Sequence, residues 1–250
     1  MYKNISWDKK FVNKVLIKDL YIEDSWKDII NKLLNDERIK NIEYMLNNYK
    51  DKINIYPYPD YLFHAFNLIP IDKVNIIIIG QDAYHNIYNN IPQAMGLAFS
   101  VQPTIPLPSS LKNIFNNMKH FGHIKDIPSN GDLTYLAKQG CLLINSALTV
   151  FENKANSHKQ LWQWFTDYII EYISNNYKDL IFVLWGAYAY KKIKYINTDI
   201  HKVIISSHPS GLSYKKRLNN FPSFSENDHF GQINEYLEQF NKPKINYNII

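Results

Sequence analysis

The chain has 250 residues, which is enough for one sizeable α/β domain with a well-buried core. Apolar residues make up 46% of it and aromatic residues 15%, which excludes a disordered chain. The formal net charge of +5 is compatible with a phosphate-binding face but does not prove one. Only Arg38 and Arg217 are arginines, which argues against sequence-specific base reading by bidentate arginine contacts.

Metal and cofactor sites find little support in the sequence. Cys141 is the only cysteine, so the chain can form no internal disulfide, cysteine-built zinc site or iron–sulfur cluster. The histidines outside the motifs are too scattered to suggest a metal site. No apolar run approaches membrane-spanning length, and residues 1–11 contain no apolar signal segment. We therefore expect no metal, no cofactor and no membrane contact, and a monomer that works inside the cell, in cytoplasm or nucleus.

The N-terminal third is predicted to be helical. Asp24 can cap a helix over residues 25–34, where apolar residues recur at helical spacing, and a second helix is expected over residues 39–49. Two prolines, Pro57 and Pro59, then mark a turn before a short helix at residues 61–66.

Four short aliphatic runs follow, and each is predicted to be a strand buried on both faces, as in parallel sheets. They lie at residues 74–79, 141–144, 180–185 and 203–205. Helical segments separate them, at residues 109–121, 161–177 and 187–196. This alternation predicts an α/β fold, a single-domain sandwich in which helices flank a central four-stranded, mainly parallel sheet.

Polar residues follow three of these strands directly. The first run leads into Gly80-Gln81-Asp82-Ala83-Tyr84-His85, the second into Asn145-Ser146, and the fourth into Ser206-Ser207-His208-Pro209-Ser210. In open parallel sheets the ligand crevice lies outside the carboxyl ends of the strands. Taken singly, Asp82 could be a helix cap, Asn145 a turn former and His208 a loop residue. Their coincidence on one sheet edge favours a functional site.

These segments resemble family 1 uracil-DNA glycosylases. Five stretches carry the resemblance in the family's order: residues 80–85 (the water-activating loop, GQDPYH), 96–101 (the uracil-stacking segment), 108–111 (the end of the proline-rich loop), 142–150 (the strand with the uracil-reading asparagine) and 208–213 (the DNA-intercalation loop, HPSPLS). The similarity extends from about residue 26 to residue 237. It implies residues 21–250 as the catalytic domain, after an N-terminal extension at residues 1–20.

The resemblance implies an enzyme that flips uracil out of single- or double-stranded DNA and hydrolyses its N-glycosidic bond, the first step of base excision repair. Cleavage builds positive charge on the sugar and negative charge on the departing base. Asp82 would stabilise the sugar cation and orient the attacking water, and neutral His208 would donate to uracil O2. Four residues would bind uracil: Gln81, Tyr84, Phe99 and Asn145. Phe99 would stack on the ring, Tyr84 would exclude the methyl group of thymine, and Asn145 would read the base edge.

On the DNA side, the resemblance implies phosphate contacts and a wedge. Four residues are candidates: Ser110, Ser210, Leu212 and Ser213. The serines would hold phosphates, and Leu212 would enter the base stack in place of the flipped uracil. His158 also matches a family segment and is expected near DNA without a catalytic role. A replication or repair protein is left open as a partner.

The chain departs from the family pattern at three positions, where Ala83 and Gly211 replace prolines and Met95 replaces a histidine. It is also longer between residues 85 and 93 and between residues 213 and 229. One alternative is therefore a DNA-binding or processivity subunit without activity, which the retained Asp82 and His208 disfavour. The other is an unrelated nucleotide-binding α/β enzyme, which the lack of a glycine-rich phosphate loop disfavours.

Overall fold

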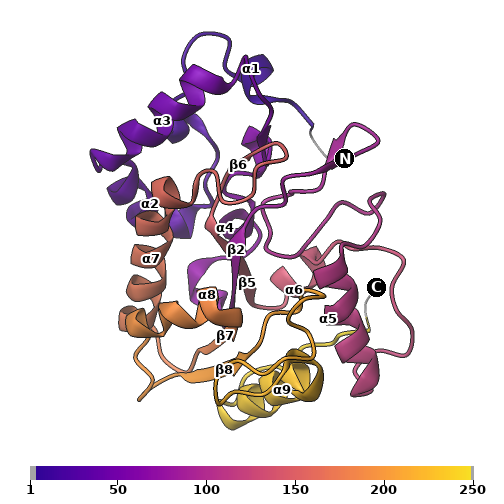
Figure 1. Ribbon diagram of the computed structural model, residues 1–250. Coiled ribbons are helices and arrows are strands. Elements are labelled where there is room, and N and C mark those ends of the chain that lie inside the picture. The colour runs from indigo at the N-terminus through magenta and orange to yellow at the C-terminus, as the bar shows by residue number, and fades with distance from the viewer. Residues whose placement is uncertain (1–3, 249–250) are drawn as a thin grey trace.

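A four-stranded parallel sheet forms the centre of the protein, in a computed structural model that describes residues 4–248 (Figure 1). The strand order is β5-β2-β7-β8, and every pairing in it is parallel. The strands are β5 (Cys141–Ala147), β2 (Ile76–Asp82), β7 (Ile181–Trp185) and β8 (Lys202–Ser206). The aliphatic residues of the inner strands are buried, as expected for a sheet covered on both faces. The predicted α/β sandwich with a parallel four-stranded sheet is confirmed.

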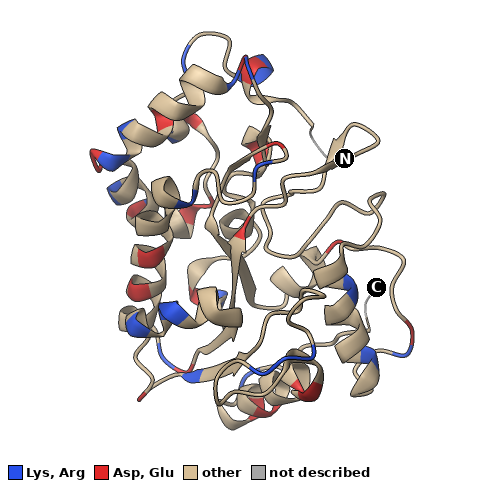
Figure 2. Cartoon of the chain, viewed as in Figure 1, with Lys and Arg blue, Asp and Glu red and all other residues tan. Residues whose placement is uncertain are grey.

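Helices cover the sheet on both sides. On one side α7 (Lys159–Asn176) packs against β5, with α3 (Arg38–Tyr49) and α2 (Lys27–Leu34) outside it (Figure 1). The other side carries α5 (Ser109–His120) and α6 (Thr134–Ala137), and α9 (His229–Gln239) lies against β8. Charged residues lie mainly on these outer helices and on the connecting segments (Figure 2). No helix among residues 4–248 is both long and apolar enough to cross a membrane.

Shorter elements complete the chain. They are the helices α1 (Trp7–Lys10), α4 (His64–Asn67) and α8 (Gly186–Tyr190), the strand pair β1 (Ile55–Tyr56) with β6 (Val150–Phe151), and the hairpin of β3 (Ile87–Tyr88) with β4 (Ile91–Pro92). Within residues 4–248 there are also six 3₁₀ turns, at Ile17–Asp19, Asp24–Trp26, Pro59–Tyr61, Ile71–Lys73, Lys191–Tyr195 and Phe224–Glu226. The predicted helix at 187–196 is thus α8 followed by a 3₁₀ turn.

The N-terminal segment packs into the main core. Trp7, Val15 and Ile17 are buried in the same hydrophobic cluster as the sheet, and Trp7 Nε1 donates to the Pro57 carbonyl at 3.0 Å. The predicted cap at Asp24 is wrong: Asp24 lies inside a 3₁₀ turn, and Glu23 caps it by accepting from the Ser25 amide. The Glu23 side chain reaches forward to the amide two residues later and so satisfies one of the free amides at the start of the turn.

Candidate active site

A pocket of about 220 Å³ opens at the carboxyl ends of β2 and β5. Seven of the predicted site residues line it: Gln81, Asp82, Tyr84, Phe99, Ser110, Asn145 and His208. They come from five separate segments of the chain, which the fold brings together as the sequence predicts. Wider hollows exist elsewhere, such as the 490 Å³ groove beside α3 and α7, but that groove holds none of these residues.

Asp82 ends β2 and carries the only carboxylate of the pocket. Its Oδ2 accepts from the Asn156 amide at 2.5 Å, while its buried Oδ1 has no partner among the described residues. Burial raises the pKa of Asp82 to about 6, although the Asn156 and Ala83 amides oppose the shift. The carboxylate is therefore mostly ionised at neutral pH, with one oxygen held and the other available to a ligand.

His208 follows β8 and faces the same pocket. Burial lowers its pKa to about 4, so the imidazole is neutral at physiological pH. The Ser210 amide donates to its Nδ1 at 3.0 Å, which places the single ring proton on Nε2. A neutral N–H donor results. The ring has room because Gly186 lies against it: a Cβ at position 186 would come within 2.8 Å of the His208 Cβ.

Asn145 lies on β5 directly opposite Gly80 of β2. A Cβ at Gly80 would approach Asn145 Oδ1 to 2.2 Å, so only glycine lets the amide occupy this place. The Asn145 side chain is almost fully buried and lines the pocket. A buried amide with one donor group and one acceptor group is suited to the edge of a polar planar ligand.

Phe99 and Tyr84 form an apolar wall of the pocket. The Phe99 ring lies edge-on to Trp185 at 5.4 Å between centroids and 5.8 Å from the His208 ring. Its φ of 64° is in the left-handed region, an unusual conformation for a phenylalanine that the packed surroundings must hold in place. The Tyr84 hydroxyl donates to the Phe99 carbonyl at 3.4 Å. The two aromatic side chains are thus fixed relative to each other.

Two polar side chains of the pocket, Asn156 and His85, were not predicted as site residues. Asn156 joins the pocket through its amide on Asp82 and through its side-chain oxygen, which accepts from Gln81 Nε2 at 2.5 Å. His85 also lines the pocket, and its Nδ1 is buried without a partner among the described residues. His85 ends the motif at residues 80–85, so the sequence contained a signal for it. Asn156 belongs to the segment at residues 156–158 that also matches the family, but nothing in the sequence indicated its contact with Asp82, which lies 74 positions away.

Comparison with known proteins bears on the identity of this pocket. The model of the uracil DNA glycosylase superfamily matches residues 66–238, which include every element that supplies the pocket. The chain belongs to the uracil-DNA glycosylase superfamily. This membership rules out the alternative of an unrelated nucleotide-binding α/β enzyme.

Relatives of this glycosylase match it over most of its length. It is 43% identical to the uracil-DNA glycosylase of Borreliella burgdorferi, over 90% of this chain and 98% of that protein. It is 37% identical to a probable uracil-DNA glycosylase of Acanthamoeba polyphaga mimivirus, over 96% of this chain and 69% of that one. The crystal structure of mimivirus uracil-DNA glycosylase superposes with a TM-score of 0.94 at 36% identity, and covers 100% of this chain and 95% of that one.

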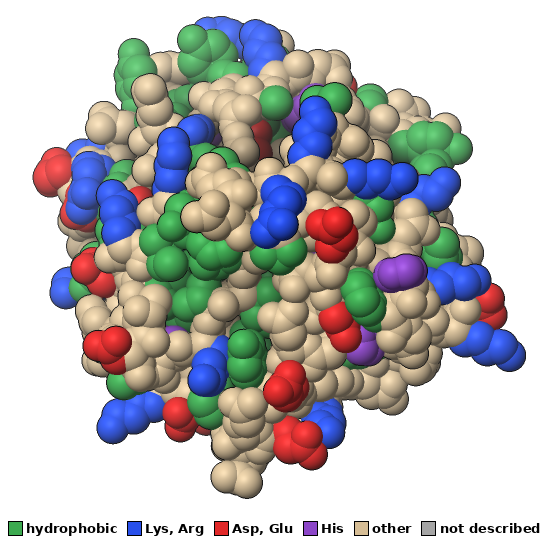
Figure 3. Space-filling model, turned by 60° about the horizontal axis from the view of Figure 1, so that its bottom comes forward, with side chains coloured by type: hydrophobic (Ala, Val, Ile, Leu, Met, Phe, Trp, Pro, Cys, Tyr) green, Lys and Arg blue, Asp and Glu red, His purple; other side chains and the backbone are tan. Residues whose placement is uncertain are grey.

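The remaining residues predicted on the DNA side lie around the mouth of the glycosylase pocket. Ser210 and Ser213 line a second hollow of about 530 Å³ that shares Gln81 and His208 with the pocket. Leu212 is 83% exposed in the same loop, which fits a wedge rather than a core residue. On the face shown in Figure 3, basic side chains lie singly among apolar and polar ones.

The expectation that His158 lies near DNA is not supported. Its ring is buried, its Nδ1 pairs with the Thr149 hydroxyl at 2.9 Å, and its ring packs edge-on against Phe151 at 4.2 Å. These contacts hold the loop after β5, while the buried Nε2 of His158 has no partner among the described residues. Among the described residues, no group of three or more His, Cys, Asp or Glu side chains could hold a metal ion.

Proposed function

We propose that this glycosylase is a family 1 enzyme that hydrolyses the N-glycosidic bond of uracil in DNA and leaves an abasic site, the first step of base excision repair. One observation carries the assignment of roles: an ionised carboxylate (Asp82), a neutral imidazole (His208) and a buried amide (Asn145) meet in one pocket. The activity itself is supported by relatives that are uracil-DNA glycosylases at 37–43% identity.

Asp82 acts on the sugar side of the bond. As the bond between C1′ and the base breaks, positive charge develops on the sugar, and the nearby carboxylate stabilises it. The free Oδ1 accepts a hydrogen bond from the water that attacks C1′, while the Asn156 amide keeps Oδ2 in place. The water oxygen forms the new bond to C1′, and its proton passes to the carboxylate or to solvent.

His208 and Asn145 act on the base side. The electron pair of the broken bond stays on uracil, and the Nε2–H of His208 donates to uracil O2, where negative charge gathers. Because the imidazole is already neutral, it adds no second positive charge beside the sugar cation. The Asn145 amide pairs with the polar edge of uracil, and its donor and acceptor order distinguishes uracil from cytosine.

Selectivity against thymine comes from the aromatic wall. Phe99 stacks on the flipped base, and Tyr84 fills the space beside C5, where thymine carries a methyl group. Its hydrogen bond to the Phe99 carbonyl limits retreat of the Tyr84 ring. A wall that cannot move rejects added bulk better than a loose apolar pocket does. Gln81, held by Asn156, closes the pocket beside the sugar.

DNA binding uses the loops at the mouth. Ser110, Ser210 and Ser213 hold phosphates through hydroxyl and amide groups, and Leu212 enters the base stack once uracil leaves it. Single- and double-stranded DNA are both substrates. The catalytic domain spans residues 21–250, and the segment before it stabilises the domain through residues such as Trp7. We propose a monomer without metal or cofactor.

The test is release of free uracil from a uracil-containing oligonucleotide, single-stranded and double-stranded, in the presence of EDTA. We expect uracil and an abasic product from both substrates. Binding of the oligonucleotide without release of uracil would instead favour the non-enzymatic DNA-binding subunit. Activity that disappears with EDTA and returns with one divalent metal would overturn the metal-free mechanism.

A further inference from the structure

A small hairpin follows directly after the pocket segment. In it β3 pairs antiparallel with β4, so that Tyr88 lies opposite Ile91 and Ile87 opposite Pro92. The hairpin begins two residues after His85, which lines the pocket. It therefore stands at the rim of the site.

The hairpin is preformed. Asn89 and Asn90 have φ values of 48° and 62°, which are typical of the tight two-residue turn that matches the twist of two strands. The Gln93 amide donates to the Asn86 carbonyl at 3.0 Å and closes its base, and Ile91 packs against the core. Because the shape of the hairpin is set before any ligand arrives, the entropy cost of ordering it on binding is small.

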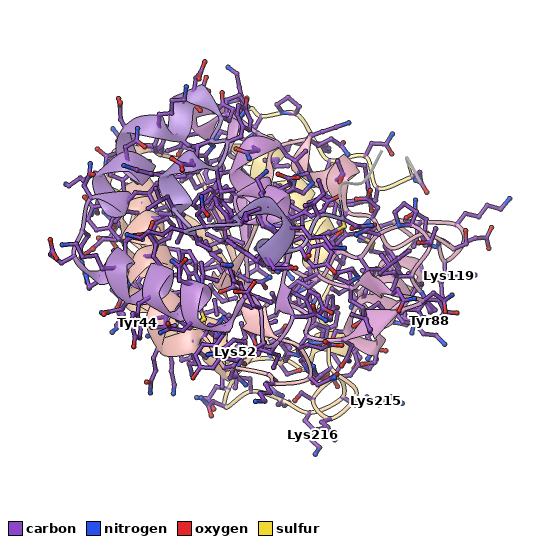
Figure 4. All side chains as sticks on the ribbon, turned by 90° about the horizontal axis from the view of Figure 1, so that it is seen from above. Tyr44, Lys52, Tyr88, Lys119, Lys215 and Lys216 are labelled. Carbon is purple, nitrogen blue, oxygen red and sulfur yellow. The ribbon has the colours of Figure 1, made fainter. Side chains whose placement is uncertain are left out.

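The outer side chains of the hairpin are apolar and exposed. Ile87 is 40% exposed and Tyr88 is 42% exposed. Because successive side chains of a strand point to opposite faces, Ile87 and Tyr88 project from the two faces of the hairpin, and Tyr88 presents its ring on one of them. Figure 4 shows Tyr88 on the lower right of the molecule, the side from which Lys215 and Lys216 of the loop after β8 also project, whereas Tyr44 lies at the far left.

We propose that this hairpin is a second DNA contact, in which Tyr88 stacks on an unpaired base of the strand that carries the uracil. The inference rests on the proposed function, because the substrate of the neighbouring pocket makes a DNA strand the occupant. Every unpaired base has a flat face that stacks on an aromatic ring. Tyr88→Phe, which removes the hydroxyl that could donate to a phosphate, separates stacking from a phosphate contact. Lysines on the same side supply the backbone contacts that bring the strand there.

The test compares Tyr88→Ala with the wild-type enzyme on a long single strand and on a uracil trinucleotide too short to reach the hairpin. We expect kcat/KM on the long strand to fall about fivefold to tenfold, the lower end of base–aromatic stacking, since protein already covers part of the ring. The single-turnover rate at saturating enzyme and the activity on the trinucleotide stay unchanged. Tyr88→Phe keeps the stacking face and retains wild-type behaviour.

The matched control is Tyr44→Ala, since Tyr44 is 72% exposed on α3, away from the pocket. Equal kcat/KM for Tyr88→Ala and wild type on the long strand would overturn the proposal, and so would an equal loss in the control. A changed slope of affinity against salt in Tyr88→Ala would show a phosphate contact and also overturn it. If the wild-type enzyme releases no uracil from either substrate, the proposed function fails instead.

Discussion

Replacing Asp82 by asparagine should make the protein more stable while it removes activity. The pKa of Asp82 is raised from its ordinary 3.8 to about 6, chiefly because the folded protein buries it. An acid with a raised folded pKa costs stability whenever it is ionised in the folded state, which here means above about pH 6. At about 1.4 kcal/mol per pH unit, the shift corresponds to at most about 3 kcal/mol.

Asparagine has the same shape, keeps an acceptor for the Asn156 amide and carries no charge. We expect Asp82→Asn to raise the free energy of unfolding by about 1–3 kcal/mol near neutral pH. The difference should shrink as the pH falls through 6 towards 3.8, since the wild-type carboxyl then becomes neutral in both states. The rate of single-turnover uracil release should fall by a factor that corresponds to a loss of about 3–5 kcal/mol of transition-state stabilisation.

Urea unfolding of both proteins, at neutral pH and at about pH 4.5, measures the effect. Asp126→Asn is the control, because that carboxylate is exposed and its 3.3 Å contact with Lys119 lies at the surface. It should change stability by less than about 0.5 kcal/mol. If Asp82→Asn proved no more stable than wild type at neutral pH, burial of an ionised Asp82 would be refuted as the cause of its raised pKa.

Three further substitutions test the surroundings of the site. Gly80→Ala should lower kcat/KM roughly a hundredfold, because the added Cβ would displace the Asn145 amide. Near-normal kinetics would show that the two strands shift apart and leave the amide in place. Tyr84→Ala should permit slow release of thymine, measured on a thymine-containing strand; complete rejection by a folded, uracil-cleaving variant would place the barrier elsewhere. Trp7→Ala should destabilise the fold by about 3–5 kcal/mol in urea unfolding, and a loss below about 1 kcal/mol would mean that the N-terminal segment is dispensable.

The sheet and the pocket could be predicted because their signals are local. Buried parallel strands are short aliphatic runs, and strand ends in such a sheet meet at one edge, so the meeting of Asp82, Asn145 and His208 followed from chain order alone. The five motif stretches added the expected roles. Contacts between segments that are far apart in the sequence leave no local pattern, so they could not be predicted in this way.

Three features illustrate what the sequence pattern could not contain. The Asn156 amide reaches Asp82 from a loop far along the chain, and only the folded backbone places it there. Trp7 is buried in the main core and donates to the Pro57 carbonyl 50 positions away, a contact with no local signal, so the first twenty residues could be taken for a loose extension. The hairpin after His85 has only two residues in each strand, too few to give a periodic pattern.

The pH dependence of uracil release tests most directly that an ionised Asp82 and a neutral His208 act in one pocket. The reaction needs the carboxylate charged, which holds above a pKa of about 6, and the imidazole neutral, which holds above about 4. We predict that kcat/KM is level above neutrality and falls roughly tenfold per pH unit below about 6, with a steeper fall once His208 protonates. A kcat/KM that stays level down to about pH 5 would contradict a charged, buried Asp82 as the group that stabilises the sugar.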